Sequence, residues 1–243
     1  MSRQPRAIHI EVINRSSYAR HMSMCLLNAR SINNKALFIK DYVVDHQIDL
    51  LGITETWTKS DGESNRVVNE LSPRGYSFIH VPRKKRSGGG VGLLYNTSLK
   101  IERVDCNSYA SFEHLEVKLD TASTVVRIAV VYRPPSSKVN KLTSTQFFDD
   151  FNDPLEHFSV SSGRLLIMGD LNFHVNEPSR DRLAAKFLDF LDSYNLAQHV
   201  TEPTHKRKGT LDLIITRANE DTVFNCKVED PDLSDHYARY TAS

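Results

Sequence analysis

Short runs of β-branched and aromatic residues recur along the 243-residue chain and predict about eleven strands. The predicted strands are residues 24–27, 49–54, 76–81, 91–95, 100–104, 115–119, 125–132, 165–168, 211–216, 222–228 and 237–241. Three other segments, 34–46, 143–158 and 182–194, place apolar residues at helical spacing. This inventory is too rich in strands for a regular βαβαβ array. It favours an α/β fold in which two sheets pack face to face with helices outside.

The chain predicts one domain preceded by a loose arm. It has no internal repeat of fixed period, no low-complexity tract and no long Pro/Gly/Ser linker, so residues 22–243 are assigned to one domain. Residues 1–21 carry charges throughout and lack a long apolar core. They are therefore predicted to form a flexible N-terminal arm, and neither a signal peptide nor a membrane span.

The basic residues are unevenly distributed, although the net charge is only +1. Two runs hold seven of the 31 basic residues and no acid, which leaves 24 basic residues against 30 acidic ones elsewhere. Such gathering suits a polyanionic partner, although for either run alone a solvated loop tip is the favoured interpretation. The runs comprise Arg83, Lys84, Lys85 and Arg86, and His205, Lys206, Arg207 and Lys208.

The three cysteines, Cys25, Cys106 and Cys226, are odd in number and far apart. Their spacing suggests neither a disulfide framework nor a thiolate zinc site. A reduced, intracellular setting is the resulting expectation.

Polar residues end several strands that are otherwise apolar. In a mixed sheet the ends of some strands and the starts of their antiparallel neighbours meet on one rim, so these side chains can converge there. Each alone has an ordinary reading as a turn former, a surface acid or a core tyrosine. Together they supply oxygen ligands for a hard cation, a base for water and donors for phosphate oxygens. The set comprises Asn28, Glu55, Tyr132, Asp170, Asn172, Asp212, Asp235 and His236.

The motifs LLNARS, ITETW, VVYRPP, GDLN, TLDLI and SDH, in this order, resemble the exonuclease–endonuclease–phosphatase superfamily, which includes apurinic endonucleases and DNase I. TETW, GGGVGLLY after a basic loop, VYRPP and EPTH followed by GTLDLII are most similar to the endonuclease domain of non-LTR (LINE-type) retrotransposons. The resemblance extends from about residue 23 to the end. It implies a four-layered α/β sandwich with two mixed, mainly antiparallel sheets and an active site on one rim.

The resemblance also implies a metal site and a catalytic group. Glu55, Asn28 and Asp235 would hold Mg²⁺, with Mn²⁺ as a substitute. Asp170 would orient and deprotonate the attacking water. His236, oriented by Asp212, would either bind a phosphate oxygen or share the base role. The donors to the pentavalent intermediate would be Asn172 and Tyr132.

The resemblance further implies contacts with double-stranded DNA from both basic runs. A hairpin carrying the second run would enter the groove, with Thr204 near the cleaved bond. The expected DNA-binding residues are Arg83, Lys84, Lys85, Arg86, Thr204, Lys206, Arg207, Lys208 and Ser234.

The expected activity is nicking of one DNA strand to leave a 3′-hydroxyl that primes reverse transcription. The chain would then be one domain of a polyprotein that includes a reverse transcriptase, monomeric, without a membrane partner, and acting in the nucleus. Two alternatives remain open. One is an abasic-site repair endonuclease or another phosphodiesterase or phosphatase of the same superfamily, and the other is a catalytically inactive DNA-targeting or protein-interaction module.

Overall fold

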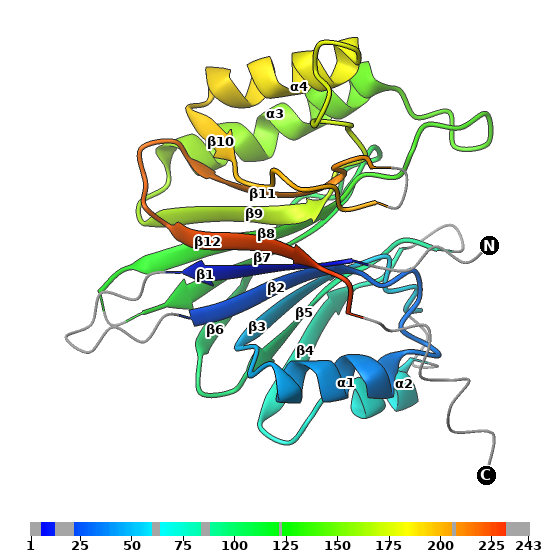
Figure 1. Cartoon of the computed structure of the whole chain (residues 1–243), viewed down its shortest axis with the longest axis vertical. Coiled ribbons are helices and arrows are strands. Elements are labelled where there is room, and N and C mark those ends of the chain that lie inside the picture. The colour runs from blue at the N-terminus through cyan, green and yellow to red at the C-terminus, as the bar shows by residue number, and fades with distance from the viewer. Residues whose placement is uncertain are drawn as a thin grey trace.

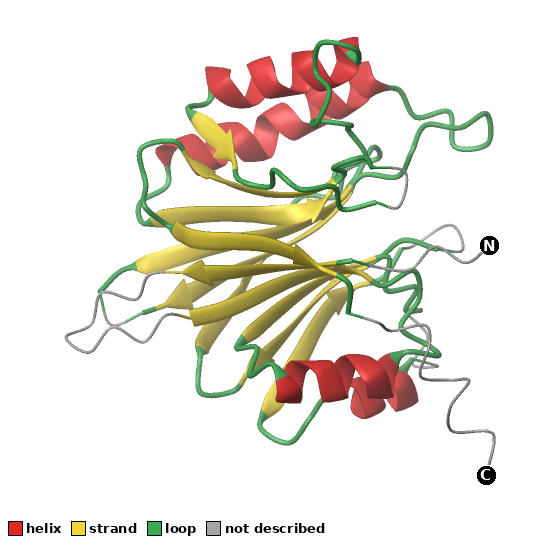
Figure 2. Cartoon of the chain, viewed as in Figure 1, coloured by secondary structure: helices red, strands yellow, loops and turns green. Residues whose placement is uncertain are grey.

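Two six-stranded sheets lie face to face, with helices covering both outer faces (Figures 1 and 2). The computed structural model describes residues 6–12, 22–59, 64–83, 88–121, 123–205 and 208–231. The arrangement confirms the expected four-layered α/β sandwich. Within the described residues, no helix is long and apolar enough to cross a membrane.

The first sheet has the strand order β12-β1-β2-β3-β5-β4. Its one parallel pair, β2 with β3, is connected through α1, and α2 precedes β4. Both helices cover the outer face of this sheet, at the bottom of Figure 1. The elements are β1 (Ala7–Val12), β2 (Met22–Asn28), α1 (Ala36–Asp45), β3 (Leu50–Thr54), α2 (Asn65–Leu71), β4 (Tyr76–Val81), β5 (Val91–Asn96) and β12 (Val223–Glu229).

The second sheet has the order β10-β11-β9-β8-β7-β6. It too contains one parallel pair, β8 with β9, connected through α3, and α4 precedes β10. These two helices lie at the top of Figure 1. The elements are β6 (Lys100–Val104), β7 (Glu113–Asp120), β8 (Val125–Tyr132), α3 (Ser144–Val160), β9 (Arg164–Asp170), α4 (Arg182–Ser193), β10 (Leu196–Gln198) and β11 (Asp212–Arg217).

The two halves repeat one topology. The succession β1-β2-α1-β3-α2-β4-β5 recurs as β7-β8-α3-β9-α4-β10-β11, and each series forms its sheet in the same spatial order. Each half therefore has one parallel pair whose carboxyl ends lie on one edge, which is where open α/β sheets build their sites. The sequence shows no repeat because the two halves share backbone connections rather than residues.

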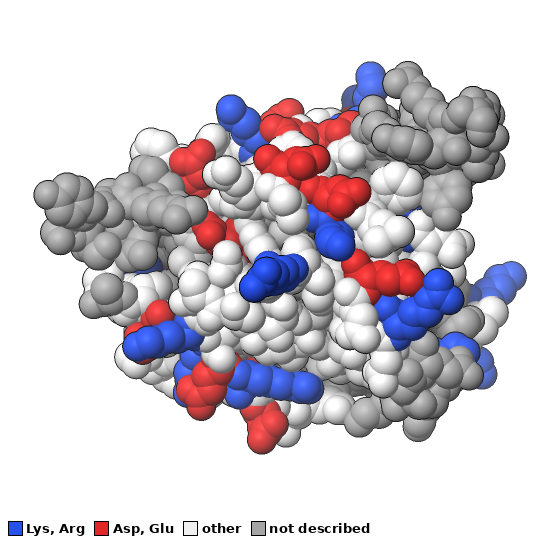
Figure 3. Space-filling view, turned by 90° about the horizontal axis from the view of Figure 1, so that it is seen from below, with Lys and Arg blue, Asp and Glu red and all other residues white. Residues whose placement is uncertain are grey.

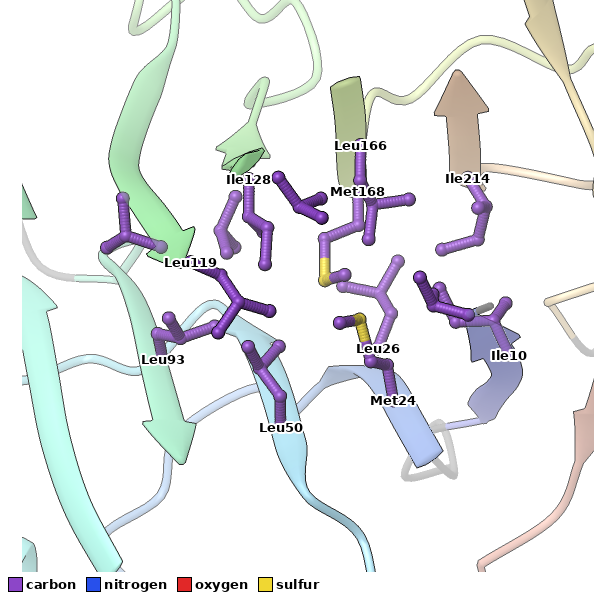
Figure 4. Packing of buried hydrophobic residues seen from close by; sticks show 14 of the residues in the cluster. Ile10, Met24, Leu26, Leu50, Leu93, Leu119, Ile128, Leu166, Met168 and Ile214 are labelled. Carbon is purple, nitrogen blue, oxygen red and sulfur yellow. The ribbon is translucent and has the colours of Figure 1, made fainter. Parts of the chain in front are cut away.

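Three apolar clusters hold the layers together. Between the sheets, side chains from both inner faces interdigitate, among them Leu26, Met24, Leu166 and Met168 (Figure 4). Phenylalanines of α3 and α4 pack on the outer face of the second sheet. Residues of α1, including Ile39, pack on the first. The central strands are buried on both faces, so their sequences are continuous apolar runs rather than alternating patterns.

Strand β1 corrects the predicted N-terminal arm. Residues 7–12 pair antiparallel with both β2 and β12, and Ile8, Ile10 and Val12 are buried between the sheets. These buried residues alternate with His9 and Glu11, which is the pattern of a half-buried strand. The charged residues around this segment obscured the pattern. Residues 1–5 and 13–21 lie outside the described part of the chain.

The other predicted elements match the structure to within a few residues, apart from the strand at 237–241, which lies outside the described residues. Two short elements were missed. Helix α2 buries only Leu71 in its seven residues, and β10 has three residues. Neither is long enough to show a period. The three cysteines form no disulfide with one another.

Gly169 is required by the close approach of β8 and β9. A Cβ atom there would lie 1.8 Å from the backbone oxygen of Val131, whereas one at Gly52 of β3 would lie 2.5 Å from the flexible Met168 Sδ. We expect Gly169→Ala to lower the free energy of unfolding by about 3 kcal/mol or more, at the upper end of overpacking costs, and Gly52→Ala by about 1 kcal/mol. Urea unfolding measures both, and equal losses would contradict this difference.

Candidate active site

The carboxyl ends of the two parallel strand pairs meet at one rim of the sandwich. In the first sheet Asn28 ends β2 opposite Thr54, and Glu55 follows directly. In the second, Tyr132 ends β8 opposite Asp170, the last residue of β9. Asp212 begins β11 and pairs with Asp170. Five of the predicted site residues are thus placed at the rim by strand register alone.

The carboxamide of Asn28 joins the two sheets. Its Nδ2 donates to Glu55 Oε1 at 3.1 Å and to Asp170 Oδ2 at 2.6 Å, so one side chain of the first sheet holds a carboxylate from each sheet. Its Oδ1 atom is buried and has no hydrogen-bond partner in the described structure. A buried acceptor without a partner is costly, and its presence indicates a site for a ligand.

Three carboxyl groups crowd this rim, and two of them, Asp170 and Asp212, have a raised pKa. Burial is the largest cause of the raised pKa of Asp170, followed by the charges of Asp212 and Glu55. Burial, opposed by a hydrogen bond from Thr204 and assisted by Glu55, raises the pKa of Asp212 to about 7. Burial and then the same Glu55 and Asp170 charges raise the pKa of Tyr132. Asp170, Asp212 and Tyr132 are thus buried close together, beside the charge of Glu55.

The donor set fits a hard divalent cation. Carboxylates held together against their repulsion, with unpartnered buried oxygens on Asn28 and Asp212, are groups that a cation would stabilise. In the described part of the chain, no three His, Cys, Asp or Glu side chains are placed to hold one ion. Mg²⁺ retains several waters and needs only one or two protein carboxylates, so this set suits it better than a metal that requires a His/Cys cage.

The loop after β3 holds Glu55 in a left-handed backbone conformation, with φ of 53°. Two hydrogen bonds fix it to the loop after β2: Ala29 N donates to Thr54 O at 3.0 Å and Ser31 N to Glu55 O at 2.8 Å. Left-handed conformations of non-glycine residues are strained and concentrate at functional sites. The carboxylate of Glu55 is therefore held in place rather than free to turn to solvent.

The loop after β9 is fixed in a similar way. Asn172 has φ of 52°, its backbone N–H donates to Asp170 Oδ1 at 3.1 Å, and its Nδ2 donates to Arg133 O at 2.7 Å. Because an amide group has two N–H donors, one remains for a phosphate oxygen. The backbone N–H of Asn172 thus orients the carboxylate of Asp170, beside which Asn172 lies.

Arg133 supports the loop after β9, a role that the sequence did not predict. Its guanidinium donates to Leu171 O at 3.0 Å and Asn172 O at 3.2 Å, and lies 4.1 Å from the centre of the Phe173 ring. Burial lowers its pKa to about 10, which leaves it charged near neutral pH. Arg133 is the arginine of the motif VYRPP, but only the fold shows that it faces the loop after β9.

Arg83 lies at the site, and its charge is compensated. Its Nε pairs with a carboxylate oxygen of Glu113, the partner of Tyr132 across β7 and β8, and its guanidinium lies 5.7 Å from the centre of the Tyr132 ring. Glu113, which the sequence did not single out, also accepts from Gly90 N. A paired arginine attracts phosphate less strongly than a free one, so its contact with DNA stays a prediction.

The predicted hairpin before β11 is present, but Thr204 does not lie on its surface. Thr204 N and His205 N both donate to Gly209 O, and Lys208 N donates to His205 O at 2.8 Å. The Thr204 side chain is only 4% exposed, and its hydroxyl accepts from Leu211 N and Asp212 N. The expected DNA contact of Thr204 is therefore corrected to support of Asp212, whereas Lys208 is exposed.

Several predicted residues lie outside the described part of the chain. They are Lys84, Lys85, Arg86, Lys206, Arg207, Ser234, Asp235 and His236. Away from the rim, the face that carries α1 and α2 mixes acidic and basic side chains (Figure 3). Mixed charges suit a solvated surface rather than one that binds a polyanion.

The chain belongs to the Endonuclease/Exonuclease/phosphatase family, whose sequence model matches residues 25–236. The family comprises endonucleases, exonucleases and phosphatases, all of which hydrolyse phosphate esters. No match was found among curated protein sequences.

Solved structures show the same fold at low sequence identity. The endonuclease domain of TRAS1, a telomere-specific non-LTR retrotransposon, has a TM-score of 0.62 at 10% identity, over 84% of this chain and 95% of that one. The AP endonuclease LMAP from Leishmania major has a TM-score of 0.59 at 15% identity, over 79% of this chain and 77% of that one. Mannosyl-6-phosphatase Bt3783 from Bacteroides thetaiotaomicron has a TM-score of 0.55 at 13% identity, over 78% of this chain and 79% of that one.

The carboxylate cluster predicts how stability depends on pH. The pKa of Asp212 is raised from 3.8 to about 7 on folding, so between these values the folded state binds more protons than the unfolded state. Its contribution therefore lowers stability as the pH rises through this window. In EDTA at pH 8, Asp212→Asn should raise the free energy of unfolding by on the order of a few kcal/mol, with little effect at pH 4.

Urea unfolding at the two pH values measures this effect. Asp120→Asn, at an exposed carboxylate at the end of β7, is the matched control and should change stability at neither pH. A variant Asp212→Asn that is less stable than the wild type at pH 8 would contradict the proposed crowding of charge.

Proposed function

We propose that this chain is a metal-dependent DNA endonuclease that nicks one strand of duplex DNA and leaves a 3′-hydroxyl end. The observation that carries the proposal is the Asn28 bridge, which places Glu55 and Asp170 of different sheets on one amide group. A carboxylate for a cation and a carboxylate for water are the two requirements of phosphodiester hydrolysis.

Glu55 and Asn28 are the residues that would hold the cation, with Asp235 as a further proposed ligand. Bound there, the ion would neutralise charge on the phosphate and lower the barrier to attack. The carboxamide oxygen of Asn28 is free to ligate because only its nitrogen is used in hydrogen bonds.

Asp170 is proposed as the base. Its raised pKa makes it a better proton acceptor than an ordinary aspartate, and hydrogen bonds from Asn28 and Asn172 fix its two oxygens. It would take a proton from water as the water oxygen attacks phosphorus. The bond from phosphorus to O3′ then breaks, and O3′ takes a proton from solvent, which yields the 3′-hydroxyl and a 5′-phosphate.

Asn172 and Tyr132 are proposed as donors to the phosphate oxygens during attack. A raised pKa keeps the Tyr132 hydroxyl protonated and so able to donate. Asp212 is proposed to orient His236, and its buried Oδ1, which has no partner in the described structure, is available for that bond.

The biological setting is part of the proposal. The motifs TETW, VYRPP and GTLDLII, together with the fold shared with the TRAS1 endonuclease domain, support an endonuclease of the non-LTR retrotransposon type. Its partners would be double-stranded DNA and a reverse transcriptase domain of the same polyprotein. It would act in the nucleus as a monomer, and the nick would prime reverse transcription.

Conversion of supercoiled plasmid to the nicked circle tests the activity. In Mg²⁺ the wild type should nick, and EDTA should abolish nicking. Asp170→Asn and Glu55→Gln should each lower the rate by about 10²–10⁴ because they remove the proposed base and the proposed ligand. Glu156→Gln, at an exposed position of α3, is the control and should retain full activity.

Comparison of an intact duplex with the same duplex containing one abasic site separates this function from repair. The proposal expects nicking of the intact duplex at a rate comparable to that of the abasic one. Cleavage confined to the abasic site would favour a repair endonuclease. DNA binding without turnover in any divalent cation would favour an inactive targeting module.

The salt dependence of binding tests the role of the hairpin. Lys208 is exposed at its tip, whereas Lys100 is exposed at the opposite end of the sandwich, where β6 begins. Each phosphate contact adds about 1 to the slope of log K against log[salt]. Lys208→Ala should therefore reduce the slope by about 1, and Lys100→Ala should leave it unchanged. Equal slopes for both variants would contradict a hairpin contact.

A further inference from the structure

We infer that Trp57 is a stacking surface for an unstacked base of the nucleotide next to the cleaved phosphate. This inference rests on the proposed function, because it requires a nucleic acid at the Glu55 site. It adds a residue that would help to select where the duplex is cut.

Trp57 is both exposed and adjacent to the reacting centre. Its side chain is 43% exposed, although tryptophan is usually mostly buried. Its indole Nε1 donates to Glu55 Oε2 at 3.3 Å. The apolar ring therefore lies within one nucleotide of any phosphate held at Glu55.

The surrounding loops fix the backbone of Trp57 and contact its indole. Trp57 has φ of 55°, and its backbone N–H donates to Gly89 O at 2.8 Å, while Thr56 N donates to Gly90 O at 3.2 Å. A Cβ atom at Gly88 would lie 3.5 Å from Trp57 Nε1, so the glycine loop passes against the ring. A pre-ordered aromatic ring loses little side-chain entropy on binding, which favours contact with a ligand.

The chemistry of the ring points to a base. Phosphates would be attracted by the basic hairpin, but an uncharged indole beside a carboxylate offers them little. Each base has a π-face, and aromatic side chains bind unstacked bases without demanding a particular sequence. Pyrimidine–purine steps unstack most readily, so the ring would favour cleavage at such steps.

Orientation of Glu55 is the competing role for Trp57, and phenylalanine separates the two. Trp57→Phe keeps an aromatic face but removes the Nε1–H that donates to Glu55. If the ring stacks, Trp57→Phe should cleave a duplex with a central TA step nearly as well as the wild type. Trp57→Ala should lower kcat/KM at that step about 10-fold and equalise cleavage at TA and A-tract sites.

Val160→Ala is the matched control, since Val160 is 83% exposed at the end of α3, just before β9 begins at the end of the sheet opposite the rim. It should keep both the rate and the TA preference. If Trp57→Phe and Trp57→Ala lower the cleavage rate equally and both retain the TA preference, the role of Trp57 is to orient Glu55. That result would overturn the inference.

Fluorescence provides a readout independent of cleavage because Trp57 is the single tryptophan of the chain. The Asp170→Asn variant, which should bind DNA without cutting it, would be titrated in Mg²⁺ with a short unlabelled duplex that has a central TA step. Its emission should fall in a saturable way as the duplex binds. Inorganic polyphosphate, which has phosphates and no bases, should bind without the same decrease.

The outcomes separate this inference from the proposed function. DNA that binds and is nicked by the wild type, with no change in Trp57 emission, would overturn the stacking role and leave the endonuclease intact. A wild-type chain that neither binds nor nicks DNA in Mg²⁺ would overturn the proposed function and the inference with it.

Discussion

The geometry of the active-site rim depends on the hydrogen bonds that the Asn28 amide donates to carboxylates of different sheets. Apolar packing holds the two sheets together but would tolerate small shifts in their relative position. The amide group fixes the rim, because Glu55 and Asp170 must both remain within its reach. The two topologically equivalent halves of the chain thus produce one site with unequal parts, a cation ligand on one side and a base on the other.

The rim is costly for the fold to maintain. Buried carboxyl groups with raised pKa values, strained backbone at Glu55 and Asn172, and orphaned oxygens on Asn28 and Asp212 all oppose stability. Charge from a bound cation and a phosphate would relieve several of these costs together. Arg133 and Glu113 act one step away, since they hold the loops that carry Asn172 and Gly90.

Strand periodicity and polar strand ends predicted the strands and a rim that gathers Asn28, Glu55, Tyr132, Asp170 and Asp212, whereas the four-layered sandwich was implied by the family resemblance. These features are local, so single segments reveal them. Thr204 was misplaced because burial of its hydroxyl depends on the turn that brings it to the backbone of β11. The support from Arg133 and the compensation of Arg83 by Glu113 depend on contacts between distant segments, and one sequence without its fold does not show them.

Anomalous diffraction from crystals of the chain soaked in Mn²⁺ tests the central claim most directly, because it locates the cation without reference to activity. The account predicts a peak within coordination distance of a carboxylate oxygen of Glu55 and of Oδ1 of Asn28. A peak elsewhere on the molecule, with Glu55 and Asp170 pointing away from each other, would contradict it.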